Sequence, residues 1–577
     1  MRLQTMLTSA AQLRNYQCRP TRQLVRLMIG TTVVLLSTHA VMAQTSPKSS
    51  GRTTKSVPKS QSAQPPSVQA TKSNAQRTNN TEIDIVRSRH RMTPPIIPKG
   101  RNVGVGPAFI YQNNIEHSIA YRQLSQLIKT TGHRLTGSPE GKAATQFIKT
   151  ALQGIGFGTA EHPHTSVELQ PFSVQAWSRE EVSLDVVPVR SDNYAPIACV
   201  SLAQTPAFSN VQAPILDCGN GLPEDWARLG TAVKGKTALF TIPAIPSSIS
   251  PTPSTNIHRS EKIALAIKAG AVACILINGA PGDILLTGTA SATGAIITVP
   301  AVCISQNSGK TLLGWLATES LVADLKVRNK IEPQEVHNVI ATVRGTDLAE
   351  EEIVVGCHLD SWDLAQGACD NGAGSAAVLE MARLLADNTL LRPRRTIKFV
   401  WFMGEEQGLL GSQHYVSQLI KSKRKKGAGQ TKYMVNLDMA YNSTGFNAFG
   451  RPEALDFFDD VGEENAYQDT SYHQKLTNKA GLHSDHEPFM LEGIPVASPD
   501  SRWSAEALNC YHADCDRLNW ISPEGLDRTA RITAILVCYL SCKDKLPAQV
   551  LDPAQTKDFL IRNGLEEALR LRGEWKW

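Results

Sequence analysis

Short apolar runs alternate with helical patterns along the second half of the chain. Three runs predict buried strands, at Ile353–Gly356, Thr396–Phe402 and Tyr433–Leu437. Two apolar patterns with helical spacing lie between and after them, at Ser375–Ala386 and Leu526–Cys542. Strands that alternate with helices predict an α/β fold, here a three-layer sandwich with a largely parallel central sheet.

The preceding segment is first helical and then rich in β-type patterns. Ser118–Gly156 has helical character, interrupted at Gly132–Pro139, where glycine and proline mark a loop. Val167–Trp177 and Val182–Val189 predict two strands.

Residues 192–329 differ from both neighbours. Their apolar runs are short and are separated by proline and glycine, with one clear helix at Ser260–Ala269 leading into a strand at Ala271–Ile277. We therefore expect a small β-rich domain inserted into an α/β domain, which would comprise residues 111–191 and 330–577.

The N-terminal arm has the order of segments that is typical of a secretory signal. An apolar run at Leu27–Leu36 follows Arg14, Arg19, Arg22 and Arg26, and small residues lead up to Ala43. This pattern predicts a signal peptide over residues 1–43 and a secreted or periplasmic, extracytoplasmic protein. A buried helix or an uncleaved anchor is the alternative, but the run is shorter than the about 20 residues that cross a bilayer. No later segment has a transmembrane pattern.

The charge of the chain is divided unevenly. Residues 1–101 contain 16 Lys and Arg but only two acidic residues, Glu82 and Asp84, which gives a net charge of +14. The whole chain has a net charge of +6, so the remaining residues carry −8. A mildly acidic body lacks the clustered basic face that phosphate binding requires, so nucleic acid is excluded as a partner. The polar, basic stretch over 44–110 is predicted to be a disordered linker.

Eleven cysteines give only a weak signal. Cys274, Cys303 and Cys357 lie in apolar, strand-like runs, where buried thiols are expected. Cys510 and Cys515 are close enough in sequence to pair, but the sequence does not assign the pairing.

Residues that bind metal ions follow the predicted strands of the α/β domain. In open α/β sheets, ligands bind beyond the carboxyl ends of the strands. The candidates there are His358, Asp370 in a glycine-rich loop, Glu405 and Glu406, Asp438, and His512 in a late loop. Imidazole and carboxylate ligands suit Zn²⁺. With the adjacent Glu405 and Glu406 counted as one position, there are three carboxylates and two histidines, which are too many for one tetrahedral site. They suit two ions about 3.5–4 Å apart, with a bridging carboxylate and a bridging water.

Two further carboxylates are expected to support this centre. Asp360 would orient the His358 imidazole from two residues away, and Asp516 would do the same for the His512 loop. Adjacent side chains diverge, so Glu405 and Glu406 cannot easily bind one ion. One would bind metal while the other would act as the general base on the bridging water.

Several stretches together resemble metallopeptidase family 28, the co-catalytic zinc aminopeptidases. They are Gly356–Asp363, Gly367–Gly374, Gly404–Gly408, Asn436–Asp438, Ser484–Phe489 and Tyr511-His512, with the Gly132–Ser138 loop. Lys262–Ile277 and Ile297–Ser305 resemble a protease-associated domain, which the resemblance assigns to the insert over residues 192–329.

This resemblance covers roughly residues 115–545 and implies a zinc-exopeptidase fold with two Zn²⁺ per chain. His358 and Asp438 would bind one ion, Glu406 and His512 the other, and Asp370 would bridge them. Glu405 would be the general base in the hydrolysis of dipeptides or of the N-terminal residue of short peptides. His486, close to these motifs, is read as a structural residue.

Three alternatives stay open at this point. The scaffold could be a catalytically silent binding protein, although its ligand set is intact. It could be a single-zinc enzyme similar to glutaminyl cyclase, which a count of bound metal would distinguish. A di-zinc carboxypeptidase of another family is less compatible, because Ser361-Trp362 follows Asp360 where a nearby proline would be expected. The side-chain preference is not set by the sequence, and a homodimer is an open alternative for the oligomeric state.

Overall fold

A computed structural model describes most of the chain after residue 104. The described ranges are 105–188, 195–244, 257–386, 392–422 and 429–577. The predicted signal peptide and all but the end of the predicted linker lie outside them. Helix α1 (Val105–His117) begins within the last residues assigned to that linker. The limits of the two inner domains stay predictions.

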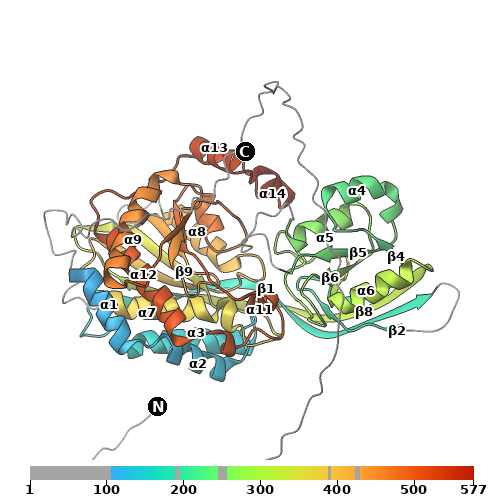
Figure 1. The fold of residues 1–577 in the computed structure, drawn as a ribbon, viewed down its shortest axis with the longest axis horizontal. Coiled ribbons are helices and arrows are strands. Elements are labelled where there is room, and N and C mark those ends of the chain that lie inside the picture. Colours follow the sequence, from blue (N-terminus) through green and yellow to red (C-terminus); the bar gives the residue numbers. More distant parts are fainter. Residues whose placement is uncertain (1–104, 189–194, 245–256, 387–391, 423–428) are drawn as a thin grey trace, which may run out of the picture. The chain divides into compact units, whose positions relative to one another are not determined.

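The central sheet is mostly parallel and contains the strands expected from the sequence (Figure 1). Strand β9 (Leu348–His358) pairs in parallel with both β10 (Arg395–Phe402) and β11 (Gln430–Asn436), and β11 pairs in parallel with β14 (Val496–Pro499). The end of β8 (Leu321–Val343) lies antiparallel to β10. The predicted fold class is confirmed.

Helices cover both faces of this sheet, because the strands are apolar on both sides. Ile353 and Val355 belong to the core of one face, and Val354 and Val400 to the core of the other. The first core includes side chains from α1, α2 (Ala120–Thr131), α3 (Pro139–Gly154), α7 (Ala373–Ala386), α9 (Leu455–Gln468) and α12 (Pro523–Cys542). The second includes α8 (Leu410–Ser422), α10 (Glu487–Met490), α13 (Pro553–Arg562) and α14 (Glu566–Leu571).

Two very long strands connect the α/β unit with the inserted one. The two strands predicted between 167 and 189 are one strand, β1 (Thr165–Pro188), paired with β8 along its length. The polar stretch around Arg179 does not interrupt β1, because its backbone stays paired with β8. A β-bulge between Arg179 and Glu181 accounts for the shift in register. Leu184 and Leu325 pack in an apolar core of the insert.

The insert contains more helix than expected. Its strands are β3 (Cys199–Ser201), β4 (Phe208–Asp217), β5 (Thr237–Ile242), β6 (Ala273–Asn278) and β7 (Ala301–Ile304), with the small β2 (Ala195–Pro196) beside β1. Its predicted helix is α5 (Arg259–Lys268), and the sequence analysis missed α4 (Pro223–Leu229) and α6 (Gln306–Leu316). Helix α6 has the ordinary start signal that was overlooked, since the Ser305 side chain accepts from the Ser308 backbone N–H.

The remaining elements are short. They are β12 (Gly445–Asn447), β13 (Lys475–Thr477), α11 (Ala505–Asn509), the 3₁₀ turns η1 (Gly230–Val233), η3 (Pro452–Ala454) and η4 (Leu518–Trp520), and the π-type turn η2 (Ala368–Gly372). Cys274, Cys303 and Cys357 are buried free thiols, as expected.

Candidate metal centre

The five expected ligands converge at the carboxyl ends of the central strands. His358 is the last residue of β9, Glu406 follows β10, and Asp438 follows β11. Asp370 lies in the η2 turn before α7, and His512 lies in the loop that follows α11. Parallel strands end at one edge of a sheet, which is why residues far apart in sequence meet here.

Asp370 lies between the two histidines and contacts each with a different oxygen. Its Oδ1 is 3.1 Å from His358 Nε2, and its Oδ2 is 3.1 Å from His512 Nε2. Asp438 Oδ1 lies 3.4 Å from His358 Nε2, and Glu406 Oε2 lies 3.1 Å from His512 Nε2. The side chains therefore form two groups that share one carboxylate.

These distances fit ligands that surround metal ions. Two atoms that each lie about 2.0–2.1 Å from a tetrahedral zinc ion are about 3.3 Å apart. The side chains are also withdrawn from water, since His358 is 1% exposed and Glu406 is 4% exposed. Ligand atoms of His358, Asp370 and Glu406 lie within 4.8 Å of one another, and Glu406 Oε1 is buried without a hydrogen-bond partner among the described residues. An unpaired buried carboxylate oxygen is costly unless a cation binds it.

The electrostatics of the group follow from burial and from these contacts. Burial raises the pKa of the Asp370 carboxyl, but hydrogen bonds from His358 and His512 outweigh it and hold that pKa below its usual range. Burial and the positive charge of Arg259 lower the pKa of His512 to about 4. A neutral imidazole and an ionised carboxylate are the forms that bind metal.

Asp360 supports the centre differently from the sequence prediction. The Nδ1 of His358 lies 3.0 Å from the backbone carbonyl oxygen of Asp360 and 3.7 Å from its carboxylate. The carboxylate instead accepts from the backbone N–H groups of Glu405 and Glu406 and from the Thr136 hydroxyl, at 3.2, 3.3 and 2.7 Å. The backbone carbonyl of Asp360 is thus the closer partner of the imidazole, and the carboxylate that the sequence predicted for this role interacts with the same Nδ1 from the longer distance.

Asp516 also has a different partner from the one predicted. Its carboxylate accepts from the backbone N–H groups of Cys369 and Asp370, at 2.7 and 3.1 Å, and so fixes the turn that carries Asp370. Burial raises the pKa of Asp516 to about 6. The Nδ1 of His512 has no hydrogen-bond partner among the described residues, so the predicted role of Asp516 toward His512 is wrong.

Asp438 is oriented by the Ser484 motif. The Ser484 hydroxyl donates to Asp438 Oδ2 at 2.6 Å, and Asn436 donates to Ser484 at 2.8 Å. His486 faces away from this contact, with Nε2 2.9 Å from the Gly481 carbonyl oxygen and its ring against Phe449.

Glu405 and Glu406 differ in exposure. Glu406 is buried against His512, whereas Glu405 is half-buried, and the structure gives its carboxylate no hydrogen bond within the described part of the chain. Burial raises the pKa of Glu405 well above its usual range, and the negative charges of Asp438 and Glu406 add to this effect. A carboxylate with a raised pKa at the edge of the site is suited to accepting a proton.

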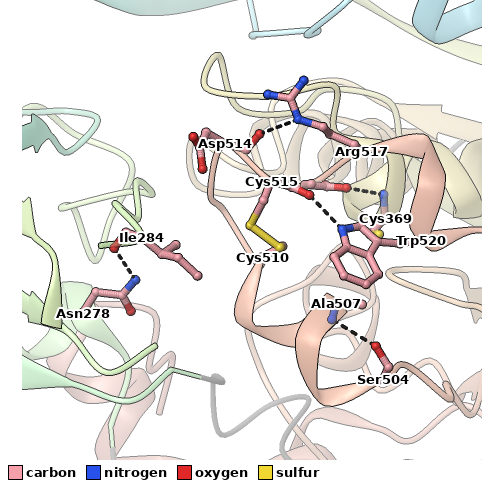
Figure 2. The surroundings of a disulfide bond; sticks show 11 residues. Asn278, Ile284, Cys369, Ser504, Ala507, Cys510, Asp514, Cys515, Arg517 and Trp520 are labelled. Atoms are coloured by element: carbon pink, nitrogen blue, oxygen red, sulfur yellow. Dashed lines mark hydrogen bonds between the residues drawn. A yellow bond between two sulfur atoms is a disulfide. The ribbon is translucent and has the colours of Figure 1, made fainter. Parts of the chain in front are cut away.

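A disulfide closes the loop that carries His512. Cys510 and Cys515 are bonded, which settles the pairing that the sequence left open (Figure 2). The Trp520 indole N–H donates to the Cys515 carbonyl oxygen at 2.8 Å. On its other side the loop contacts the insert, where the Thr287 N–H donates to the His512 carbonyl oxygen at 2.9 Å.

The insert also brings a positive charge to the centre, which the sequence analysis missed. Arg259 begins helix α5, is 7% exposed, and has no carboxylate within ion-pair distance among the described residues. Its Nε is buried without a hydrogen-bond partner, and its guanidinium interacts with the hydroxyl of Tyr511, whose ring stacks on His512. Gly288 lies against the Arg259 guanidinium and has a φ of +142°, a conformation that L side chains rarely adopt. One arginine at a helix start gives no functional signal by itself.

A small cavity opens at the ligands. It is lined by Trp362, Asp370, Glu406, His512, Ala513 and Asp516, among other residues. Its volume is about 10 Å³, room for about one water molecule beside the ligands.

Comparisons with known proteins identify related families. Residues 338–537 match peptidase family M28, and residues 185–312 match the PA domain. Carboxypeptidase Q of Bos taurus is 26% identical over 426 residues, which are 72% of this chain and 84% of that protein. The structure of an aminopeptidase from Aneurinibacillus sp. strain AM-1 is 27% identical, with a TM-score of 0.55 over 77% of this chain and 97% of that one. A zinc aminopeptidase from Bacillus subtilis, 24% identical, shares the fold with a TM-score of 0.54, over 75% and 97% of the two chains.

Proposed function

The chain belongs to peptidase family M28 and is a metallopeptidase that hydrolyses peptide bonds, and we propose that it is a di-zinc exopeptidase acting on dipeptides and on the N-terminal residue of short peptides. One observation carries the proposal. The two oxygens of Asp370 each contact the Nε2 of a different histidine, and each of these Nε2 atoms contacts one further carboxylate. That is the ligand arrangement of two ions that share a bridging carboxylate.

The proposed ligands divide into two sets. His358, Asp438 and one oxygen of Asp370 would hold one ion, and His512, Glu406 and the other oxygen would hold the second. When bound, the ions would polarise the peptide carbonyl and make water more acidic. Asp360 and Asp516 keep the ligand-bearing backbone in place through the hydrogen bonds described above.

Glu405 is the proposed general base. It accepts a proton from the attacking water and delivers it to the leaving amine, which requires a carboxylate that is near the ligands but is not one of them. Its half-buried position next to the buried Glu406 meets this requirement.

The position of Arg259 favours a substrate that has a free carboxylate. A guanidinium in a buried setting gains most from a carboxylate that can accept two parallel hydrogen bonds. Arg259 lies beside Tyr511 and His512 and has no such partner within the described residues. In a dipeptide the C-terminal carboxylate is one residue from the scissile bond, so a guanidinium beside the His512 loop is its proposed partner.

We further propose that the protein is exported, as its N-terminal pattern predicts. The Cys510–Cys515 disulfide supports this, because disulfides persist mainly in oxidising compartments. Within the described residues no helix has the length and apolar character needed to cross a membrane.

The function is tested by hydrolysis of a dipeptide panel alongside metal analysis. We expect two zinc ions per chain, loss of turnover in a chelator, and recovery when zinc is added back. N-acetylated dipeptides should react poorly if the free amino group is also recognised. One zinc per chain would favour single-metal cyclisation, and peptide binding without hydrolysis by the zinc-loaded protein would favour a silent binding role; either result contradicts the proposal.

Arg259→Gln is expected to weaken the use of substrates that end in a free carboxylate. Loss of a hydrogen bond to a charged group of about 1.5–3 kcal/mol should raise KM for dipeptides about 10- to 100-fold. KM for the matching C-terminal amides should change little, and the zinc content should stay at two. Equal effects on acids and amides would contradict a carboxylate-binding role.

A further inference from the structure

Arg134, in the loop between α2 and α3, is a fully buried arginine that no metal ligand touches. Its side chain is 0% exposed, and within the described part of the chain no carboxylate lies within ion-pair distance of it. Three of its nitrogens donate to backbone carbonyl oxygens instead. Nε donates to Leu359 at 2.7 Å, Nη1 to Gln366 at 2.8 Å, and Nη2 to Gly367 at 2.7 Å.

These three carbonyls belong to the two loops that carry His358 and Asp370. Leu359 directly follows His358, and Gly367 lies three residues before Asp370. One planar group thus spans the loop after β9 and the loop before α7. The ligands that these loops carry contact each other at 3.1 Å, a distance that a small shift of either loop would change.

The backbone of Arg134 strengthens the connection. Its N–H donates to the Ser361 hydroxyl at 3.0 Å, and its carbonyl oxygen accepts from the Ser361 N–H at 3.3 Å. Two residues later, Thr136 donates to Asp360, which holds the Glu405–Glu406 backbone. The loop at 134–136 therefore contacts three of the segments that form the centre.

A guanidinium is suited to this position for a physical reason. Burying a charge without a counter-ion is costly, and three charge-assisted hydrogen bonds offset part of that cost. Further compensation comes from the negative charges of Asp516, Asp360, Asp370 and Glu406 in the surroundings. Lysine has the same charge, but its compact ammonium lacks the rigid fork that reaches three diverging carbonyls.

We infer that Arg134 is a positioning residue that holds the His358 loop and the Asp370 loop at the separation needed for a shared metal site. The inference rests on the proposed metal centre, but it does not depend on which peptide is hydrolysed. Its role is exerted through the backbone of the ligand loops, and Arg134 itself touches neither substrate nor metal.

The test is the zinc affinity of Arg134→Lys, measured by competition with a chromogenic chelator. Residues that support metal ligands typically contribute about 10- to 100-fold to metal affinity, and a loss of that size is expected here. The melting temperature of the zinc-free protein is measured in parallel. Activity at saturating zinc should be largely restored, because lysine keeps the charge and excess zinc compensates for weaker binding.

Arg395 provides a matched control. It is 2% exposed and also donates to backbone carbonyls, those of Leu540, Lys543 and Asp544, with Glu351 as its ion-pair partner. It begins β10, and at about 3.3 Å per residue it lies about 23 Å from the end of that strand at the metal centre. Arg395→Lys should lower the melting temperature and leave zinc affinity unchanged.

The outcomes separate the inference from the proposed function. Unchanged zinc affinity in Arg134→Lys, or an equal loss in Arg395→Lys, overturns the positioning role even if the wild type hydrolyses dipeptides. A zinc-loaded wild type that hydrolyses no peptide contradicts the proposed function, while a selective affinity loss in Arg134→Lys still supports the inference. If Arg134→Lys does not fold, Ser361→Ala removes one hydrogen bond of the same connection, for which a loss of about 2- to 10-fold in zinc affinity is expected. No change in that variant would overturn the inference.

Discussion

Glu405→Gln is expected to lower kcat by about 10²- to 10⁴-fold while two zinc ions stay bound, because this is the range that a positioned general base contributes. Glutamine keeps the size and shape of the side chain but cannot accept the proton from water at neutral pH. The half-buried carboxylate of Glu405 has no hydrogen bond in the described structure, so the substitution should break no contact that supports the fold. The measurement is kcat for a good dipeptide substrate, together with metal content by atomic emission.

Glu406→Gln is the matched comparison, since it changes the adjacent residue in the same way. Glu406 is buried and lies 3.1 Å from His512, so its replacement should reduce the zinc content rather than only the turnover. Glu405→Gln should thus lower turnover at full zinc content, whereas Glu406→Gln should lower the zinc content itself. Wild-type turnover in Glu405→Gln, or loss of zinc from that variant, would show that the general-base assignment is wrong.

Asp370→Asn is expected to have the largest effect on metal binding. Both oxygens of Asp370 are in contact with histidines, and an amide would place an N–H₂ group where one of these oxygens lies. The carboxylate charge, which would be shared by two ions, is lost as well. We expect the zinc content to fall to one ion or fewer per chain, and hydrolysis to fall with it.

Asp360→Asn supplies a graded control for that result. The Asp360 carboxylate accepts hydrogen bonds from the backbone of Glu405 and Glu406. It is not a proposed metal ligand, and it lies 3.7 Å from Nδ1 of His358, which is one. Its replacement should weaken zinc binding by about 10- to 100-fold, as is usual for a supporting residue.

Because a ligand that binds only the folded state stabilises it, zinc should raise the melting temperature of the wild type more than that of Asp370→Asn. A full zinc content in Asp370→Asn would contradict the bridging role.

Much of the fold could be predicted because its elements are encoded locally. The runs at Ile353–Gly356 and Thr396–Phe402 are apolar at successive positions, which fits strands covered on both faces, and both are strands of the central sheet. The single strand β1 was predicted as two, because a polar stretch near Arg179 resembles a break in any local pattern. Pairing with β8, which is distant in sequence, decides that it continues.

The convergence of the candidate ligands was predictable for a related reason. His358, Glu406 and Asp438 each come at the end of a strand or shortly after it, and parallel strands end at the same edge of the sheet. The supporting residues were not predictable in this way. Asp516 is close in sequence to His512, to which it was assigned, but its carboxylate accepts from the backbone of the Asp370 turn. The carboxylate of Asp360 also accepts from the Glu405 and Glu406 backbone, which no local pattern indicates.

The sequence by itself determined the α/β alternation, the insert and the types of candidate metal-binding residues that gather after the strands. Each of these follows from local periodicity or from the order of residues after strands. Only the tertiary structure decided that Asp370 contacts both histidines, that Arg259 of the insert reaches the His512 loop, and that Arg134 spans two ligand loops. These contacts join segments separated by many residues, and their geometry depends on loop conformations that no local pattern encodes.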